Sequence, residues 1–203
     1  MSQDLLVVAD WLTGGSPRDQ AIFDLALVAF WGLARLGKVT SGSLQPVTTQ
    51  DFSFFGAAAV ITLQAAKTAG PGELQYLTLA KLYNCLCPVS AVTRLLSGCT
   101  TAGDQLFGYL TDTHWVTLSK PEVVSKLHKV WRANSRAGLS GHSFWMGGAL
   151  FRYALGVSTE AICEAGRWKS DSYNLYMKSY STASKADSFS LLRALDATWC
   201  AGS

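Results

Sequence analysis

The chain has 203 residues, of which 49% are hydrophobic and 15% are charged. This length and composition suit one well-buried domain and exclude a disordered chain. The net charge of +3 is small for a protein that binds duplex DNA through many phosphates, so charge alone indicates weak DNA affinity at best. We find no uncharged apolar run of about eighteen residues and no secretory leader, so the sequence predicts neither a membrane segment nor export.

Five cysteines are present, an odd number without the spacing of a zinc site. Cys85 and Cys87 are separated by one residue, whereas a zinc knuckle needs two or more. The histidines do not cluster with this pair. We therefore expect reduced thiols, no metal site and an intracellular protein.

The first part of the chain predicts a loosely packed start and then a core helix. Residues 1–15 form a short apolar patch that ends in glycines, which we interpret as a lead-in segment. Ser16-Pro17 has the form of a helix cap followed by a first helical residue, and apolar residues recur at helical spacing up to about residue 36. Arg35 lies at the end of this helix, where the helix dipole favours a cation.

The middle of the chain predicts a hairpin between helices. Residues 41–56 are rich in turn formers, and two β-type runs, 57–67 and 74–80, flank a Gly/Pro turn next to Lys67. A helix follows from the cap at Cys87-Pro88 to about residue 97, then irregular chain, then a helix over 119–136. His128 lies off the apolar stripe of that helix, so we expect it to face solvent, and His114 falls in a loop.

The most informative stretch is residues 139–182, which predicts three short helices. Gly141-His142-Ser143 opens the first, Ser158 caps the second after Gly156, and Gly166 ends the second near Trp168. Ser170 or Asp171 caps a third helix that carries Tyr173 and Tyr176. This spacing predicts that His142, Trp168 and a tyrosine converge on one pocket.

The order of these motifs resembles a known family. Gly-His-Ser-Phe, Gly-Val-Ser, Gly-Arg-Trp-Lys-Ser-Asp and then Tyr is similar to the catalytic carboxyl-terminal half of the tyrosine recombinases, or phage integrase superfamily, most of all to those of fungal Crypton and DIRS mobile elements. The resemblance covers about residues 17–181. It implies an α+β, mainly α fold with a small antiparallel sheet, in which 1–15 is a lead-in, 16–183 the catalytic domain and 184–203 a C-terminal helix or tail.

The resemblance also implies roles for particular residues and a partner. Tyr176 is the nucleophile that forms a 3′-phosphotyrosyl bond, Arg35 and His142 bind the phosphate, Lys67 is the general acid, and Trp168 packs on the phosphate and donates a hydrogen bond to it. Tyr173, three residues earlier on the same helix face, competes with Tyr176. Double-stranded DNA is the implied partner, no cofactor is required, and the location is the nucleus if the source is eukaryotic.

Two positions depart from the family's pattern. Its second arginine belongs three residues after the histidine, where this chain has Trp145, and its acidic residue near the first arginine is replaced by Lys38. Loss of one oriented donor costs on the order of 10²–10³ in rate, and loss of an arginine that neutralises a phosphoryl group about 10³–10⁵. Arg152, two turns along the helix, and Arg167 are candidate substitutes that we rank low.

Three hypotheses therefore remain from the sequence. The chain is a DNA strand transferase weakened by Trp145, a recombinase-derived DNA-binding or protein-interaction domain without catalysis, or a helical domain whose matches arise by chance. The pattern over 184–199 has two equal interpretations: a helix that folds back on its own core, or one that docks on a second copy to make a homo-oligomer.

Overall fold

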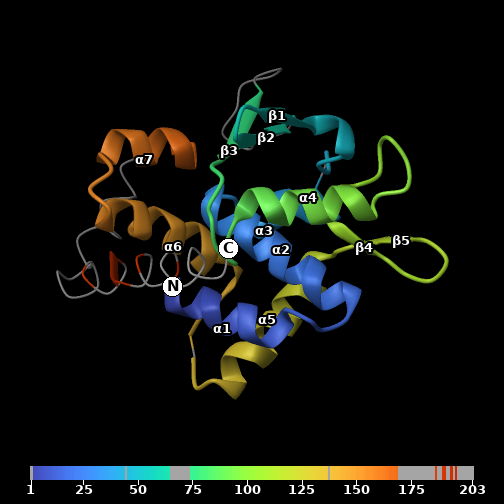
Figure 1. Cartoon of the computed structure of the whole chain (residues 1–203), viewed down its shortest axis with the longest axis horizontal. Coiled ribbons are helices and arrows are strands. Elements are labelled where there is room, and N and C mark those ends of the chain that lie inside the picture. The colour runs from blue at the N-terminus through green and yellow to red at the C-terminus, as the bar shows by residue number, and fades with distance from the viewer. Residues whose placement is uncertain are drawn as a thin grey trace.

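The computed structural model describes residues 2–43, 45–64, 74–136 and 138–168, together with Ala186, Phe189, Ser190, Arg193 and Leu195. It is mainly helical with two small antiparallel sheets (Figure 1), as the sequence predicts. The elements are α1 (Ser2–Leu12), α2 (Pro17–Trp31), α3 (Leu36–Val39), η1 (Thr49–Asp51), β1 (Phe52–Phe55), β2 (Ala58–Leu63), β3 (Gln75–Leu79), α4 (Pro88–Gly98), β4 (Gly108–Leu110), β5 (Trp115–Thr117), α5 (Lys120–Ala133), α6 (Gly141–Ala154) and α7 (Thr159–Gly166).

Helix α2 is the centre of the fold. Residues 21–30 are all buried, because α2 is apolar on nearly every side and α1, α4, α6 and β4 pack around it. Figure 1 shows α2 between the three-stranded sheet at one end of the molecule and α1 with α5 at the other. The helix begins at the predicted cap, where the Ser16 side chain accepts a hydrogen bond from the amide of Asp19. It ends at Trp31, earlier than predicted, so Arg35 lies beyond it.

One carboxylate lies inside this apolar helix. Asp24 is 1% exposed, and Arg94 of α4 binds it through both Nε, at 3.1 Å from Oδ1, and Nη2, at 2.6 Å from Oδ1. Gln20 donates a further hydrogen bond to it at 3.1 Å. Burial raises the pKa of Asp24 although Arg94 and Gln20 act to lower it. The ion pair therefore fixes how α4 lies on α2.

The expected lead-in segment is instead a packed helix, which corrects the prediction of a loose start. Leu5, Val8 and Leu12 of α1 have no exposed surface, and α1 packs on α2 and α5. An ion pair between Arg136 and Asp4, at 3.3 Å, joins the start of α1 to the chain after α5. The apolar residues of 2–12 recur at helical spacing, but the short segment lacks a strong N-terminal cap residue to mark it as a helix.

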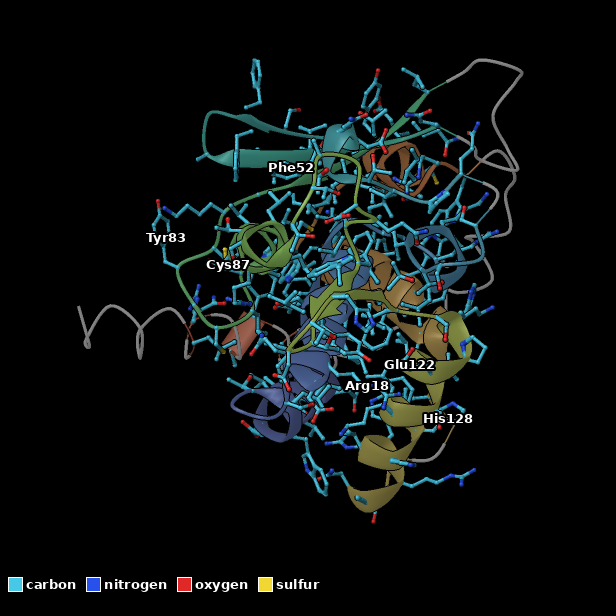
Figure 2. All side chains as sticks on the ribbon, turned by 90° about the vertical axis from the view of Figure 1, so that its right-hand side faces the viewer. Arg18, Phe52, Tyr83, Cys87, Glu122 and His128 are labelled. Carbon is cyan, nitrogen blue, oxygen red and sulfur yellow. The ribbon has the colours of Figure 1, made fainter. Side chains whose placement is uncertain are left out.

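Helices α2 and α5 begin side by side, and two ion pairs join their N-terminal ends. Ser119 and Glu122 cap α5 as Ser16 and Asp19 cap α2. Arg18 of α2 binds Glu122 at 2.5 Å, as Figure 2 shows, and Lys126 of α5 binds Asp19 at 2.6 Å. Burial acts to raise the pKa of Asp19, but hydrogen bonds from Lys126 and Ser16 outweigh it and lower that pKa.

The predicted hairpin is present as β2 and β3. These strands pair antiparallel with Ile61 opposite Leu77, and each strand alternates buried and less buried residues. Two further pairings were not predicted: β1 adds to β2 within residues 41–56, and β4 pairs with β5 in the stretch that we expected to be irregular. Trp115 of β5 donates its indole N–H to the carbonyl of Gln105 at 2.9 Å, which holds the second hairpin against the core.

His128 does not face solvent, contrary to the sequence prediction. It lies on α5 (Figure 2), where it is half-buried with its ring centroid 5.9 Å from that of Trp131. Its Nε2 atom is buried. The large Trp131 ring covers one side of the histidine although His128 lies off the main apolar stripe.

Near the C-terminus, the described residues Ala186, Phe189, Ser190, Arg193 and Leu195 are helical, and Leu195 packs against the main core. This contact favours the interpretation in which the last helical pattern folds back on its own domain. In the described ranges, no helix is long and apolar enough to cross a membrane. The same residues contain no group of three or more His, Cys, Asp or Glu side chains that could hold a metal.

Candidate active site

Arg35 is placed by a tight turn rather than by the end of a helix. The amide of Ala34 bonds the carbonyl of Ala29 at 2.9 Å and the amide of Leu33 bonds that of Phe30 at 3.4 Å, which together form a Schellman-type ending of α2. Leu33 takes the left-handed conformation, with φ 48°, that glycine normally fills. Arg35 then serves as the N-cap of α3 and its side chain is exposed.

His142 lies in the first turn of α6, as the sequence predicts. Ser140 is the cap of this helix, and its side chain accepts a hydrogen bond from the amide of His142 at 3.3 Å. Partial burial and the nearby charge of Arg35 lower the pKa of His142 below 6.5. The imidazole is therefore neutral at pH 7 in the free protein, so Arg35 carries the formal positive charge of this pair.

Three of the predicted site residues lie around Trp145: Arg35, His142 and Trp168. The guanidinium carbon of Arg35 lies 4.9 Å above the centre of the Trp145 ring, and the His142 ring centroid is 4.8 Å from it. Trp168 meets Trp145 edge to face, with ring centroids 4.6 Å apart and an angle of 82° between the rings. Residues far apart in the sequence therefore form one cluster, with a neutral indole at the position where the resemblance implies a second arginine.

Trp145 is also part of a small hydrophobic core of its own. It is 4% exposed and packs with Leu33, Met146, Ala149 and Ile162, separately from the main core. This second core joins α6 and α7 to the turn after α2. Where the resemblance implies a guanidinium group, this position therefore has an apolar indole that packs α6, α7 and the turn after α2 together. The indole provides one N–H donor.

Helix α7 is capped by Ser158 and ends at Gly166, both as predicted. Arg167 follows in the left-handed conformation, with φ 57°, and the amide of Trp168 bonds the carbonyl of Cys163 at 3.0 Å. This second Schellman-type ending turns the chain back, so that Trp168 packs against Gly166 and reaches Trp145. Trp168 is half-buried there.

The two candidate substitute arginines are bound elsewhere. Arg152 donates to the carbonyl of Trp31 at 2.5 Å, and Arg167 donates to the carbonyls of Leu33 at 2.6 Å, Gly32 at 3.3 Å and Tyr76 at 3.1 Å. Burial, with the charges of Arg152 and Arg35, lowers the pKa of Arg167 to about 10, so it stays protonated at neutral pH. These main-chain contacts argue against either arginine as a replacement for the missing one.

Several predicted residues lie outside the described residues: Lys67, Tyr173 and Tyr176, with the cap candidates Ser170 and Asp171. Their roles stay predictions. Beside Trp168 the structure has a pocket of about 610 Å³ between β3 and α7 that we did not predict, lined among others by Tyr76, Thr78, Cys163, Glu164, Arg167 and Trp168. The pocket depends on the contact between Arg167 and β3, which no sequence pattern indicates.

Comparison with solved structures identifies the fold. The XerH site-specific recombinase in its post-cleavage complex with palindromic difH substrate matches with a TM-score of 0.64 and 12% identity, over 87% of this chain and 47% of that chain. The Flpe–Holliday junction complex matches with a TM-score of 0.58 and 12% identity, over 89% and 46%. The chain has the fold of a tyrosine recombinase catalytic domain.

A transposon integrase has a similar structure. The Tn1549 integrase in complex with circular intermediate DNA matches with a TM-score of 0.53 and 10% identity, over 93% of this chain and 62% of that chain. This chain spans about half the length of the XerH and Flpe chains that it matches. No protein-family model matches it, and no curated protein sequence does.

Proposed function

We propose that the chain binds the phosphate backbone of duplex DNA at the cluster around Trp145 and breaks and rejoins DNA strands through Tyr176, with activity weakened by the missing second arginine. The observation that carries this proposal is the convergence of Arg35, His142 and Trp168 on Trp145. The similar structures, which are recombinases and an integrase in complex with DNA, support it. The motifs of residues 139–182 further support an origin in a mobile element of the fungal Crypton and DIRS type.

In this proposal the chemistry needs no cofactor. The phenolate oxygen of Tyr176 attacks the scissile phosphorus, the bond from phosphorus to the 5′-oxygen breaks, and Lys67 gives a proton to that leaving oxygen. Arg35 binds a non-bridging oxygen through its planar N–H donors. His142 and Trp168 donate further hydrogen bonds. The 3′-phosphotyrosyl bond retains the energy needed for religation.

One observation favours an alternative, a DNA-binding domain without strand cleavage. Trp145 is buried and Arg152 and Arg167 are bound to carbonyls, so the described part of the site has one guanidinium group, that of Arg35, directed at the cluster. A transferring phosphoryl group normally needs more charge compensation than this. DNA binding is common to both proposals, and cleavage separates them.

A covalent trap tests the proposal. Partly randomised duplexes with a 5′-bridging phosphorothiolate, whose sulfur leaves without an acid, are incubated with the native chain and with the Tyr176→Phe, Tyr173→Phe and Trp145→Arg variants, then denatured in SDS and separated on a gel. We expect a slow adduct from the native chain that is absent with Tyr176→Phe and retained with Tyr173→Phe. Trp145→Arg should form it on the order of 10² times faster or more.

The outcomes of the covalent trap distinguish strand cleavage from DNA binding without cleavage. An adduct that survives Tyr176→Phe would remove Tyr176 from the mechanism. If neither the native chain nor a Trp145→Arg variant that is folded by circular dichroism forms an adduct, while both bind the same duplexes in a gel-shift assay, the domain binds DNA without cleaving it.

A further inference from the structure

Three successive carbonyl groups, those of the last residue of α2 and of the two turn residues that follow it, are bound by arginine side chains. Arg152 binds the carbonyl of Trp31, and Arg167 binds those of Gly32 and Leu33. Carbonyls at a helix end have no partner inside the helix, so each must be satisfied from outside. Here two guanidinium groups do this, although a mutual repulsion acts between them and lowers the pKa of Arg167. We call Arg152 and Arg167 the arginine pair.

The turn that they hold is strained. Leu33 has φ 48°, a conformation that is costly for a residue with a branched side chain, and its side chain has no exposed surface. The surrounding structure must therefore keep Leu33 in place. The hydrogen bond from Arg167 to the Leu33 carbonyl, at 2.6 Å and across 134 residues of sequence, is the direct contact that does so. The second guanidinium nitrogen of Arg167, Nη1, bonds Tyr76 of β3 and Ala165 of α7.

Arg35 depends on this turn for its position. It follows Leu33 by two residues, and in the part of the chain that the structure describes no carboxylate pairs with it. Lys38 occupies the place of the acidic residue expected nearby. The Trp145 ring supports the Arg35 guanidinium from one side, but the backbone position of Arg35 is set by the turn.

We propose that Arg167, assisted by Arg152, is a positioning residue that fixes the strained turn after α2 and so places Arg35 against Trp145 and His142. The proposal rests on the proposed function only in assigning Arg35 to the phosphate. Arg167 acts through main-chain carbonyls of the turn and not through the DNA. This role explains how a half-buried cation is accommodated although no carboxylate among the described residues pairs with it, because its partners are carbonyls at the negative end of the α2 dipole.

The first test needs no DNA. Hydrogen exchange of backbone amides is measured by NMR for the native chain and for Arg167→Gln, with Arg132→Gln, which removes the same charge from an exposed position on α5, as the control. We expect the Ala34 amide to exchange about tenfold faster or more in Arg167→Gln, because the turn opens more often, while amides in the middle of α5 keep their native rates. Native exchange at Ala34 in Arg167→Gln would overturn the proposal.

Arg167→Lys keeps the proposal testable if Arg167→Gln fails to fold. Lysine preserves the charge, but one ammonium group cannot bond the carbonyls of Leu33 and Tyr76 together as the guanidinium fork does. We expect faster exchange at Ala34 in this variant too. Native rates in Arg167→Lys would show that charge alone is required and would contradict the positioning role.

The second test asks whether Arg167 acts through Arg35. Binding of a short fluorescent duplex is measured at several salt concentrations for Arg35→Ala, Arg167→Gln and the double variant. We expect each single variant to weaken binding and to lower the salt slope by about one phosphate contact, and the double variant to bind no more weakly than Arg35→Ala. Additive losses would overturn the proposal, because they would mean that Arg167 contacts DNA itself.

The outcomes of the two tests distinguish a failure of the positioning role from a failure of the proposed function. If Arg35→Ala leaves DNA binding unchanged, the proposed function is wrong in its assignment of Arg35, whereas faster exchange at Ala34 in Arg167→Gln still supports the positioning role. If exchange is native and Arg35→Ala weakens binding, the positioning role is wrong and the proposed function stands.

Discussion

At the residue scale, the distribution of charge in the site differs from the distribution that its motifs imply. At the position where the resemblance implies a second arginine, the chain has an indole, with Arg35 above its ring and Trp168 in edge-to-face contact with it. A cation above an indole gains about 0.5–1 kcal/mol at an exposed position, far less than a guanidinium contributes to a phosphoryl transition state. Trp145 is thus suited to holding Arg35 and poorly suited to replacing its missing partner.

His142 should report the charge of Arg35 in its titration. Because burial and Arg35 lower its pKa, the unfolded chain binds more protons than the folded one in a window just below pH 6.5. Its contribution to stability is therefore complete above pH 6.5 and is lost as the pH falls through the folded pKa. Arg35→Ala should move the His142 midpoint upward, as followed by imidazole NMR signals.

An unmoved His142 midpoint in Arg35→Ala would mean that burial alone lowers this pKa and that the two side chains are not coupled. Bound phosphate should also raise the midpoint, because an anion favours the charged imidazole.

At the element scale, the helices with clear caps were predictable, whereas α1 and the links between the helices were not. The caps at Ser16, Ser119 and Ser158 and the 3.6-residue periodicity identify α2, α5 and α7 because a helix is specified by neighbours in sequence. Strand β1 and the hairpin of β4 and β5 were missed, since strands of three or four residues offer little alternation to detect. The left-handed turn at Leu33 was missed because the residue that binds its carbonyl, Arg167, follows α7, 134 residues later in the sequence.

Gly148 sets how closely α6 approaches α2. A β-carbon at this position would lie 2.0 Å from the carbonyl oxygen of Phe30 and 2.7 Å from the Leu33 side chain, so Gly148→Ala must push the helices apart. We expect a loss of about 2 kcal/mol in the free energy of unfolding, from urea titration, and weaker DNA binding because the turn before Arg35 moves.

Gly37→Ala is the control for that experiment. A β-carbon there would meet only the Lys120 side chain, at 3.7 Å, so the substitution should be neutral or stabilising by up to about 1 kcal/mol. Equal and small effects of the two substitutions would mean that α6 has room to move away from α2 without cost.

At the scale of the whole molecule, the site and the stability of the domain are not independent. Trp145 lies in the second hydrophobic core, which joins α6 and α7 to the turn after α2. The resemblance predicted that Arg35, His142 and Trp168 belong together, but not that Trp145 is part of a core. That requires knowing that Leu33 and Ile162 face the same place.

Restoring the arginine should therefore destabilise the fold. Trp145→Arg would put a guanidinium beside Arg35 at a position that is 4% exposed, and an unpaired buried charge costs about 3–5 kcal/mol, a large part of the roughly 5–15 kcal/mol that holds a domain folded. Trp11→Arg, the same change at a residue that is 53% exposed, should cost less than about 1 kcal/mol. Urea unfolding of both variants measures the difference.

If Trp145→Arg is as stable as the native chain, the fold has kept a place for the second arginine, and the indole is a recent replacement rather than a part of the structure. If it is destabilised as expected but regains stability with a bound duplex, the phosphate supplies the missing counter-charge, which is the behaviour that a recombinase site requires.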